Sequence, residues 1–268
     1  MPDGMRDQLS HRRFYPWELR SKSTAFLRLA NRFNISEFAY AHRGLWTKNG
    51  PSENSIEAFK AAATQGLGIE FDVRPAADGV PMVFHDPSLD RMTHQVGSVD
   101  KIPSADLTAI ELNGGGRIPT LEMLLNVWPA KTPLLCELKI DGDTDPVIFT
   151  GRVAALLDQH AGPAAMMSFS RSAVAAIPDS IMRGQLISPS SLSKAENLAS
   201  TPLVDVDYLA CHVSDAKNAS LQAARSTCPL VTWTVTDLDT CAALAPYTDS
   251  QIFEAFDPTL AKRHIVNT

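Results

Sequence analysis

The segment GIEFDVR, residues 68–74, is a short apolar run that carries Glu70 and Asp72 two positions apart. Side chains two positions apart on a strand point to the same face, so both acids would lie on one side of it. Two carboxylates in apolar surroundings repel each other and lose hydration unless a positive group is nearby. The segment therefore predicts a buried strand whose acids either reach water at the strand end or bind a cation.

Short apolar runs of this kind recur along the chain and alternate with helical patterns. They predict strands at 37–43, 68–74, 80–85, 133–139, 164–169, 182–188, 206–212, 229–235 and 250–255. Helices are predicted between most of them, at 55–66, 120–128, 145–162 and 237–247. The first of these helices has a good N-cap residue, Ser55, and stops at Gly66. Apolar strands that alternate with helices indicate βαβ units and a parallel sheet buried on both faces.

Eight βα repeats remain when the segment 80–85 is counted as a strand that pairs with its neighbour. Eight repeats in about 230 residues favour a (β/α)8 TIM barrel over an open sheet. Residues 86–118 interrupt the alternation, because they lack a clear helical period and contain three consecutive glycines. We therefore expect an α/β protein in which residues 37–268 form one TIM-barrel domain, with a small insertion at about 86–118 after the second strand.

Composition narrows the class of protein. The 268 residues carry a formal net charge of −6, which argues against a nucleic-acid partner. Four cysteines without CxxC spacing indicate neither a zinc site nor a disulfide framework. No run is apolar for long enough to span a membrane, and the N-terminus lacks the apolar core of a secretory signal. We expect a cytoplasmic protein, and the sequence does not indicate its oligomeric state.

Residues 1–36 form a basic leader, with seven Arg or Lys residues against three acids. Such a segment can contact an anionic membrane surface, or it can pack on the domain with its basic side chains in water. We favour packing on the domain and keep peripheral membrane contact as the alternative.

Polar residues gather where the predicted strands end, and this end of a TIM barrel carries the active site. They are His42, Arg43, Glu70, Asp72, His85, Glu137, Lys139 and Trp233. Each alone has a structural explanation, such as a surface ion pair, but their joint position favours a site. Oxygen ligands from Glu70, Asp72 and Glu137 select a hard cation, Mg²⁺ or Ca²⁺, over zinc. His42 and His85 beside that cation provide an acid and a base at neutral pH.

The segment 41–93 strongly resembles the glycerophosphodiester phosphodiesterases through an ordered set of short motifs. The motifs are HRG at 42–44, SENS at 52–55, AF at 58–59, E-x-D at 70–72, DG at 78–79, HD at 85–86 and L-x-R-x-T at 89–93. An E-x-K pair at 137–139 and a WTV stretch at 233–235 follow downstream. The resemblance covers about residues 38–256. It implies metal-dependent hydrolysis of glycerophosphodiesters to glycerol 3-phosphate and an alcohol such as choline or ethanolamine.

The resemblance also implies roles for individual residues. Glu70, Asp72 and Glu137 would hold the divalent cation. His42 and His85 would act as general base and general acid, in either order. The nucleophile would be the glycerol 2-hydroxyl, through a transient cyclic phosphate, or water.

Four further residues are implied to bind the substrate. Arg43 and Lys139 would hold phosphate oxygens, and Trp233 would face the glycerol or the leaving group. Glu53, in the SENS motif, would also contribute to substrate binding.

The sequence departs from the family pattern at several positions that bear on the substrate rather than on the metal or histidine positions. Ser52 replaces a proline, the loop 45–49 is unusual, and Thr236 stands where Asn is common. The stretch 252–258, IFEAFDP, replaces a pattern with a glycine and a Thr-Asp pair. Glu254 within it could enter the mouth of the barrel or pack at its rim.

Other functions remain open at this point. Phospholipase D-like enzymes that act on lysophospholipids or sphingomyelin share these motifs, and a sugar or opine phosphodiester is a further candidate substrate. A non-catalytic phosphate-binding barrel would be expected to have lost a histidine or an acid, and none is lost here. A sugar-phosphate isomerase barrel would leave the cluster of acids unexplained.

Overall fold

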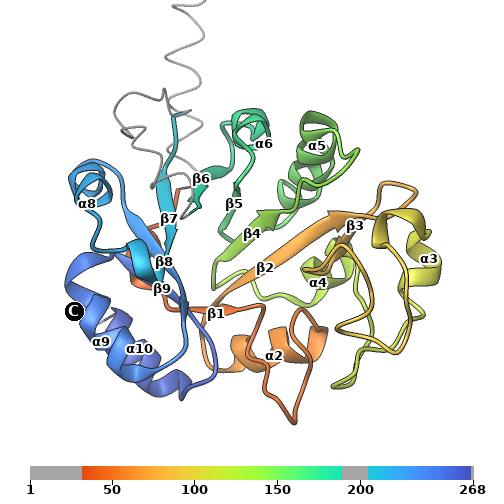
Figure 1. The fold of residues 1–268 in the computed structure, drawn as a ribbon, viewed down its shortest axis with the longest axis horizontal. Coiled ribbons are helices and arrows are strands. Elements are labelled where there is room, and N and C mark those ends of the chain that lie inside the picture. Colours follow the sequence, from red (N-terminus) through yellow and green to blue (C-terminus); the bar gives the residue numbers. More distant parts are fainter. Residues whose placement is uncertain (1–31, 189–204, 267–268) are drawn as a thin grey trace, which may run out of the picture.

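Parallel strands close into a barrel in the computed structural model, which describes residues 32–188 and 205–266 (Figure 1). In order around the barrel the strands are β1 (Tyr40–His42), β2 (Gly68–Pro75), β4 (Leu134–Leu138), β5 (Ala164–Ser168), β6 (Met182–Ile187), β7 (Tyr208–His212), β8 (Leu230–Val235) and β9 (Ser250–Phe253). Pairing of β1 with both β2 and β9 closes the ring of eight strands. The short strand β3 (Pro81–Val83) pairs antiparallel with β2. The predicted (β/α)8 TIM barrel is confirmed.

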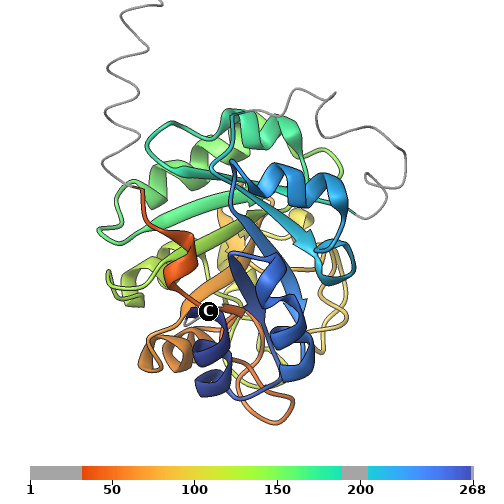
Figure 2. The ribbon, with the colours of Figure 1, turned by 90° about the vertical axis from the view of Figure 1, so that its left-hand side faces the viewer.

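Helices lie outside the strands (Figures 1 and 2). They are α2 (Ile56–Thr64), α4 (Leu121–Val127), α5 (Pro146–Leu157), α6 (Arg171–Ala176), α8 (Ala219–Arg225), α9 (Leu238–Leu244) and α10 (Pro258–Val266). Helix α2 begins after Ser55, whose hydroxyl accepts a hydrogen bond from the Ala58 backbone N–H at 3.2 Å. Gly66, just beyond the helix, has φ +64°, so the predicted cap and stop residues are both present.

Short 3₁₀ helices complete the described elements. They are η1 (Ile35–Glu37), η2 (Val99–Lys101), η3 (Val213–Asp215) and η4 (Ala245–Tyr247). Segment η1 lies against α10 near the C-terminus (Figure 2). Residues 1–31, most of the predicted basic leader, lie outside the described residues.

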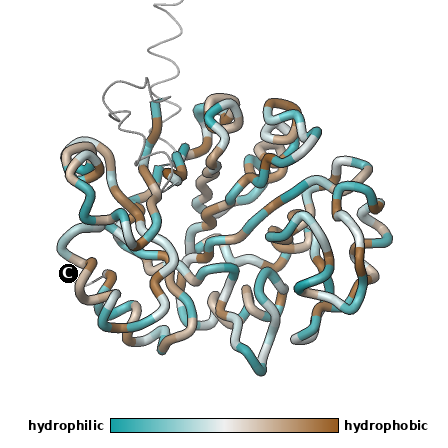
Figure 3. The backbone as a smooth tube through the Cα atoms, viewed as in Figure 1, coloured by the Kyte–Doolittle hydropathy of each residue, from teal (hydrophilic) through white to brown (hydrophobic). Residues whose placement is uncertain are grey.

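Alternation along β2 explains how acids occur within an apolar run. Ile69, Phe71 and Val73 are fully buried in the apolar cluster that the outer face of the barrel shares with the helices. Glu70 and Asp72 therefore lie on the inner face, because successive side chains of a strand point to opposite sides. Figure 3 shows hydrophobic residues along the strands and more hydrophilic residues in the outer loops.

The barrel interior is filled below its mouth. Tyr40 and Tyr208 are fully buried in a second apolar cluster of inward-facing residues. Gly184 leaves room for one of these rings, since a Cβ added there would lie 2.2 Å from the Tyr208 ring. Inward-facing positions below the mouth thus carry apolar side chains such as Leu135, Met167 and Val231.

Residues 86–118 pack beside the mouth and include a short helix, α3 (Ser104–Leu107). Their apolar side chains, among them Leu89 and Leu107, form a separate small cluster with Met82 of β3. The Gly114 backbone N–H donates to the Ser52 hydroxyl at 2.9 Å, which joins this segment to the loop after β1. Within the described part of the chain, no helix has the length and apolar character that a membrane span needs.

Candidate active site

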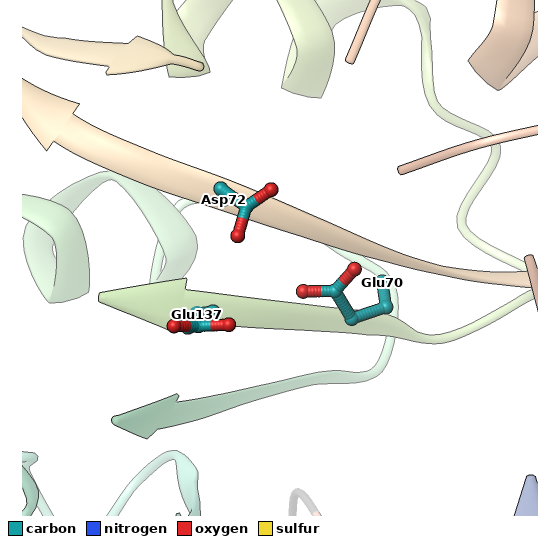
Figure 4. Close-up of side chains that lie close together, drawn as sticks. All are labelled: Glu70, Asp72 and Glu137. Atoms are coloured by element: carbon teal, nitrogen blue, oxygen red, sulfur yellow. The ribbon is translucent and has the colours of Figure 1, made fainter. Parts of the chain in front are cut away.

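Three carboxylates meet at the mouth of the barrel (Figure 4). Glu70 and Asp72 project from β2, and Glu137 projects from the adjacent strand β4, where it is the register partner of Asp72. One oxygen from each side chain lies within 4.8 Å of the others. The three residues are only 2%, 1% and 8% exposed. Neighbouring parallel strands thus bring together acids that lie 67 positions apart in the sequence, from residue 70 to residue 137.

Two cations border this carboxylate cluster. The Arg43 Nε lies 3.2 Å from Asp72 Oδ2, and the Lys139 Nζ lies 2.9 Å from Asp72 Oδ1. Lys139 also donates to Glu137 Oε1 at 2.6 Å. Asn54 donates its side-chain amide to Asp72 Oδ2 at 2.9 Å. Asp72 is therefore the most fully neutralised of the three acids.

The pKa values follow from burial and from these neighbours. Burial, together with the charges of Asp72 and Glu137, raises the pKa of Glu70 well above its ordinary value. Burial also raises the pKa of Glu137 to about 7, although Lys139 acts against it. Burial opposes ionisation of Asp72 as well, but Lys139 and Arg43 outweigh it and hold the pKa of Asp72 well below its ordinary value.

These residues fit a divalent cation. The donors are carboxylate oxygens, which hard cations prefer. Three carboxylates face two cations, Arg43 and Lys139, and burial raises the pKa values of two of the acids, Glu70 and Glu137. A further positive charge between these oxygens would favour their ionised forms.

Each predicted histidine has one ring nitrogen against a carboxylate. His42, the last residue of β1, has Nδ1 2.5 Å from Glu254 Oε2 and Nε2 3.8 Å from Glu70 Oε2. His85, two residues beyond β3, has Nδ1 2.6 Å from Asp86 Oδ1. Burial lowers the pKa of His85 despite the attraction of Asp72, which favours the neutral form of the ring.

A cavity of about 120 Å³ opens between these groups. Its lining includes both histidines, both cations and two of the acids: His42, Arg43, Glu70, His85, Glu137, Lys139, Met167, Phe169, Leu186, Trp233, Thr234 and Ile252. Trp233 lies edge-on to Phe169, with ring centres 5.9 Å apart. A neighbouring cavity of about 510 Å³ shares His85, Glu137, Lys139 and Phe169 with the first one.

Glu53 does not line the cavity. Its carboxylate accepts from Arg43 Nη1 at 2.7 Å and from Arg91 Nη2 at 2.7 Å. Arg91 in turn donates to Asp86 at 2.6 Å, and Asp86 contacts His85. A chain of ion pairs therefore links Arg43 to His85 around the outside of the cavity.

Four residues of this site were not predicted as site residues: Asn54, Asp86, Arg91 and Glu254. The first three occur inside the motifs quoted above, so their place in the sequence was the available signal. Glu254 was named only as a residue that could enter the mouth or pack at its rim, and the structure pairs it with His42, which is 212 positions away. Among the predicted residues, the structure brings His42, His85, Arg43, Lys139, Trp233 and the three acids together, and it places Glu53 behind Arg43.

Comparisons with known proteins agree on one family. The model of the "Glycerophosphoryl diester phosphodiesterase family" matches residues 42–247. The "Probable glycerophosphodiester phosphodiesterase 2" of Mycobacterium tuberculosis is 41% identical over 92 residues, which cover 34% of each chain. The glycerophosphodiester phosphodiesterase of Caldanaerobacter subterraneus is 40% identical over 89 residues, 30% of this chain and 36% of that one. The matched segments thus span about a third of these relatives.

Solved structures share the fold. An Oleispira antarctica phosphodiesterase, determined in complex with the product sn-glycerol-3-phosphate, has a TM-score of 0.70 at 24% identity. The match covers 86% of this chain and 97% of that one.

Proposed function

Because the chain belongs to the glycerophosphoryl diester phosphodiesterase family, we propose that it hydrolyses glycerophosphodiesters to glycerol 3-phosphate and an alcohol. The observation that carries this proposal is the cavity itself, which is lined by two histidines, Arg43, Lys139 and carboxylates. The glycerol 3-phosphate bound to the Oleispira phosphodiesterase supports the same product class. We further propose that residues 37–268 act as one domain and that 86–118 is an insertion in it.

The metal requirement is part of the proposal. Glu70, Asp72 and Glu137 hold one divalent cation, Mg²⁺ or Ca²⁺. When bound, this cation supplies positive charge to the phosphate oxygens. The clustering of their oxygens within 4.8 Å and the raised pKa values of two of the acids support this assignment.

Arg43 and Lys139 bind the phosphate group. Both line the cavity, and negative charge develops on phosphate oxygens as a nucleophile adds. Fixed cations in a site shielded from water stabilise that charge strongly. Trp233 forms an apolar wall against which the glycerol or the leaving group packs.

His42 and His85 transfer protons. One accepts the proton of the nucleophile, and the other donates a proton to the oxygen of the departing alcohol. The nucleophile is the glycerol 2-hydroxyl or water. Both histidines line the same cavity, which supports a shared role in one reaction.

The test is a substrate panel with matched variants. Glycerophosphocholine, glycerophosphoethanolamine and lysophosphatidylcholine are incubated with Mg²⁺, Ca²⁺ or a chelator, and released glycerol 3-phosphate and free choline are measured separately. We expect release of glycerol 3-phosphate that the chelator abolishes. Release of choline from lysophosphatidylcholine alone would favour the phospholipase D-like alternative, and binding of phosphate without turnover would favour a non-catalytic barrel.

Single histidine variants test the acid–base pair. His42→Ala and His85→Ala should each lower kcat by about 10²–10⁴-fold, since general acid–base catalysis contributes rate factors of that size. His94→Ala is the control, because His94 is an exposed residue of the insertion. Near-normal turnover of either cavity variant would remove that histidine from the mechanism.

A further inference from the structure

Glu254 occupies a defined position beside the catalytic cavity. It follows directly after β9, and its backbone N–H donates to the Val235 carbonyl of β8 at 2.9 Å. The next residue, Ala255, has φ 67°, a conformation that non-glycine residues seldom adopt. Such a conformation costs free energy, and residues strained in this way cluster at active sites and ligand clamps. The backbone is thus anchored on one side of Glu254 and sharply turned on the other.

The side chain of Glu254 contacts His42 and leaves one ring nitrogen free for a ligand. An ionised carboxylate only accepts hydrogen bonds, so the 2.5 Å contact with Nδ1 requires the proton to be on that nitrogen. The other nitrogen, Nε2, is 3.8 Å from Glu70 Oε2, beyond hydrogen-bond distance. His42 therefore presents an unprotonated Nε2 in its neutral form.

The corresponding pair at the other histidine is built differently. Asp86 contacts His85 Nδ1 and also accepts two hydrogen bonds from Arg91, so a guanidinium shares its charge. Within residues 32–188 and 205–266, Glu254 has an ion pair with His42 and none with a lysine or arginine. Among the described residues, the hydrogen bond and ion pair given for this carboxylate are both with the imidazole of His42.

We propose that Glu254 is a positioning residue for His42: it fixes the Nδ1–H tautomer and turns Nε2 toward the reacting oxygen. The contact joins the ends of β1 and β9, neighbouring strands of the barrel wall, so it holds the ring across the mouth. This role rests on the proposed phosphodiesterase activity and adds to it a residue outside the metal, phosphate and histidine set. Orientation by a hydrogen-bonded carboxylate fixes a histidine in one tautomer, and loss of that tautomer impairs catalysis.

Two substitutions of Glu254 distinguish a role in positioning His42 from a purely structural role. Glu254→Ala removes the acceptor, whereas Glu254→Gln keeps an amide oxygen that can accept the same hydrogen bond. We expect kcat for glycerophosphocholine to fall about 10- to 100-fold in Glu254→Ala, with KM within about threefold and partial recovery in Glu254→Gln. Glu122→Gln is the matched control, because Glu122 is an exposed residue of α4.

A second readout does not depend on turnover. In metal-free protein with ¹⁵N-labelled histidine, the His42 signals are assigned by their loss in His42→Ala. We expect the Nδ1–H tautomer in the wild type and a shift toward the Nε2–H tautomer in Glu254→Ala.

The outcomes distinguish this inference from the function on which it rests. An unchanged His42 tautomer in Glu254→Ala, or a kcat within threefold of an active wild type, would overturn the role of Glu254. An inactive wild type with every diester would instead overturn the proposed activity. Should Glu254→Ala fail to fold, Glu254→Leu, which also lacks an acceptor, is measured in its place: loss of the Nδ1–H tautomer with a reduced kcat would support the role, and an unchanged tautomer or a kcat within threefold would overturn it.

Discussion

At the scale of single residues, charge balance governs the site. Asp72 contacts Arg43, Lys139 and Asn54, while Glu70 and Glu137 are less fully compensated. Burial enlarges the difference in pKa between Asp72 and the other two acids, because charges interact more strongly away from water. Each acid therefore has a distinct electrostatic setting even though all three lie within one cluster.

Asp72→Asn should weaken binding of Mg²⁺ or Ca²⁺ by at least about tenfold, because affinity for hard cations depends on the number of charged ligands. Isothermal titration calorimetry with each cation measures this directly. Asp106→Asn, a change of the same type at an exposed position of α3, should leave the affinity unchanged. Identical titration curves for Asp72→Asn and the wild type would contradict the assignment of this acid to the metal.

At the scale of secondary-structure elements, packing inside the barrel differs sharply from packing on a helix surface. A Cβ at Gly184 in β6 would lie 2.2 Å from the Tyr208 ring, whereas a Cβ at Gly151 in α5 would meet nothing within 4 Å. Gly151 is exposed. The same substitution should therefore have opposite effects at the two positions.

Gly184→Ala should lower the free energy of unfolding by about 1–3 kcal/mol, because overpacking displaces a buried ring. Gly151→Ala should raise it by about 0.5–1 kcal/mol, since alanine is the better helix former. Urea denaturation of both variants beside the wild type measures the two effects. Equal shifts of the same sign would contradict the packed barrel interior.

At the scale of the whole molecule, the reactivity of the four cysteines depends on how deeply the fold buries each thiol. Cys136, Cys211 and Cys241 are buried, and Cys228 is half-buried, with no disulfide among them. Burial raises the pKa of Cys211 to about 12 and the pKa values of Cys228 and Cys241 to about 11. The thiol forms are therefore stabilised in the folded protein.

Thiol reactivity should accordingly be low in the native protein. The pKa values of these thiols are higher in the folded than in the unfolded protein. Their protonated forms therefore stabilise the folded protein fully below the ordinary thiol pKa, and this contribution is lost as the pH rises toward 11–12. At pH 8 we expect slow reaction with a disulfide reagent in the folded state and rapid reaction of all four thiols in denaturant. Rapid native reaction of several cysteines would contradict the buried positions.

Local patterns in the chain were sufficient to predict the barrel. Apolar runs such as 68–74 and caps such as Ser55 act over a few residues, so their periodicity predicts strands and helices without knowledge of distant contacts. The rule that strand ends carry the site then singled out the histidines and acids that line the cavity. The cytoplasmic location and the leader's contacts stay predictions.

Contacts between distant segments required the folded chain. The pairing of Glu254 with His42, 212 positions apart, and the position of Glu53 behind Arg43 have no local signature. Closure of β9 onto β1 creates the first contact, and the loop after β1 creates the second. Residue types and their spacing therefore specified which groups reach the mouth, whereas strand order and register decided which carboxylate faces each imidazole or guanidinium.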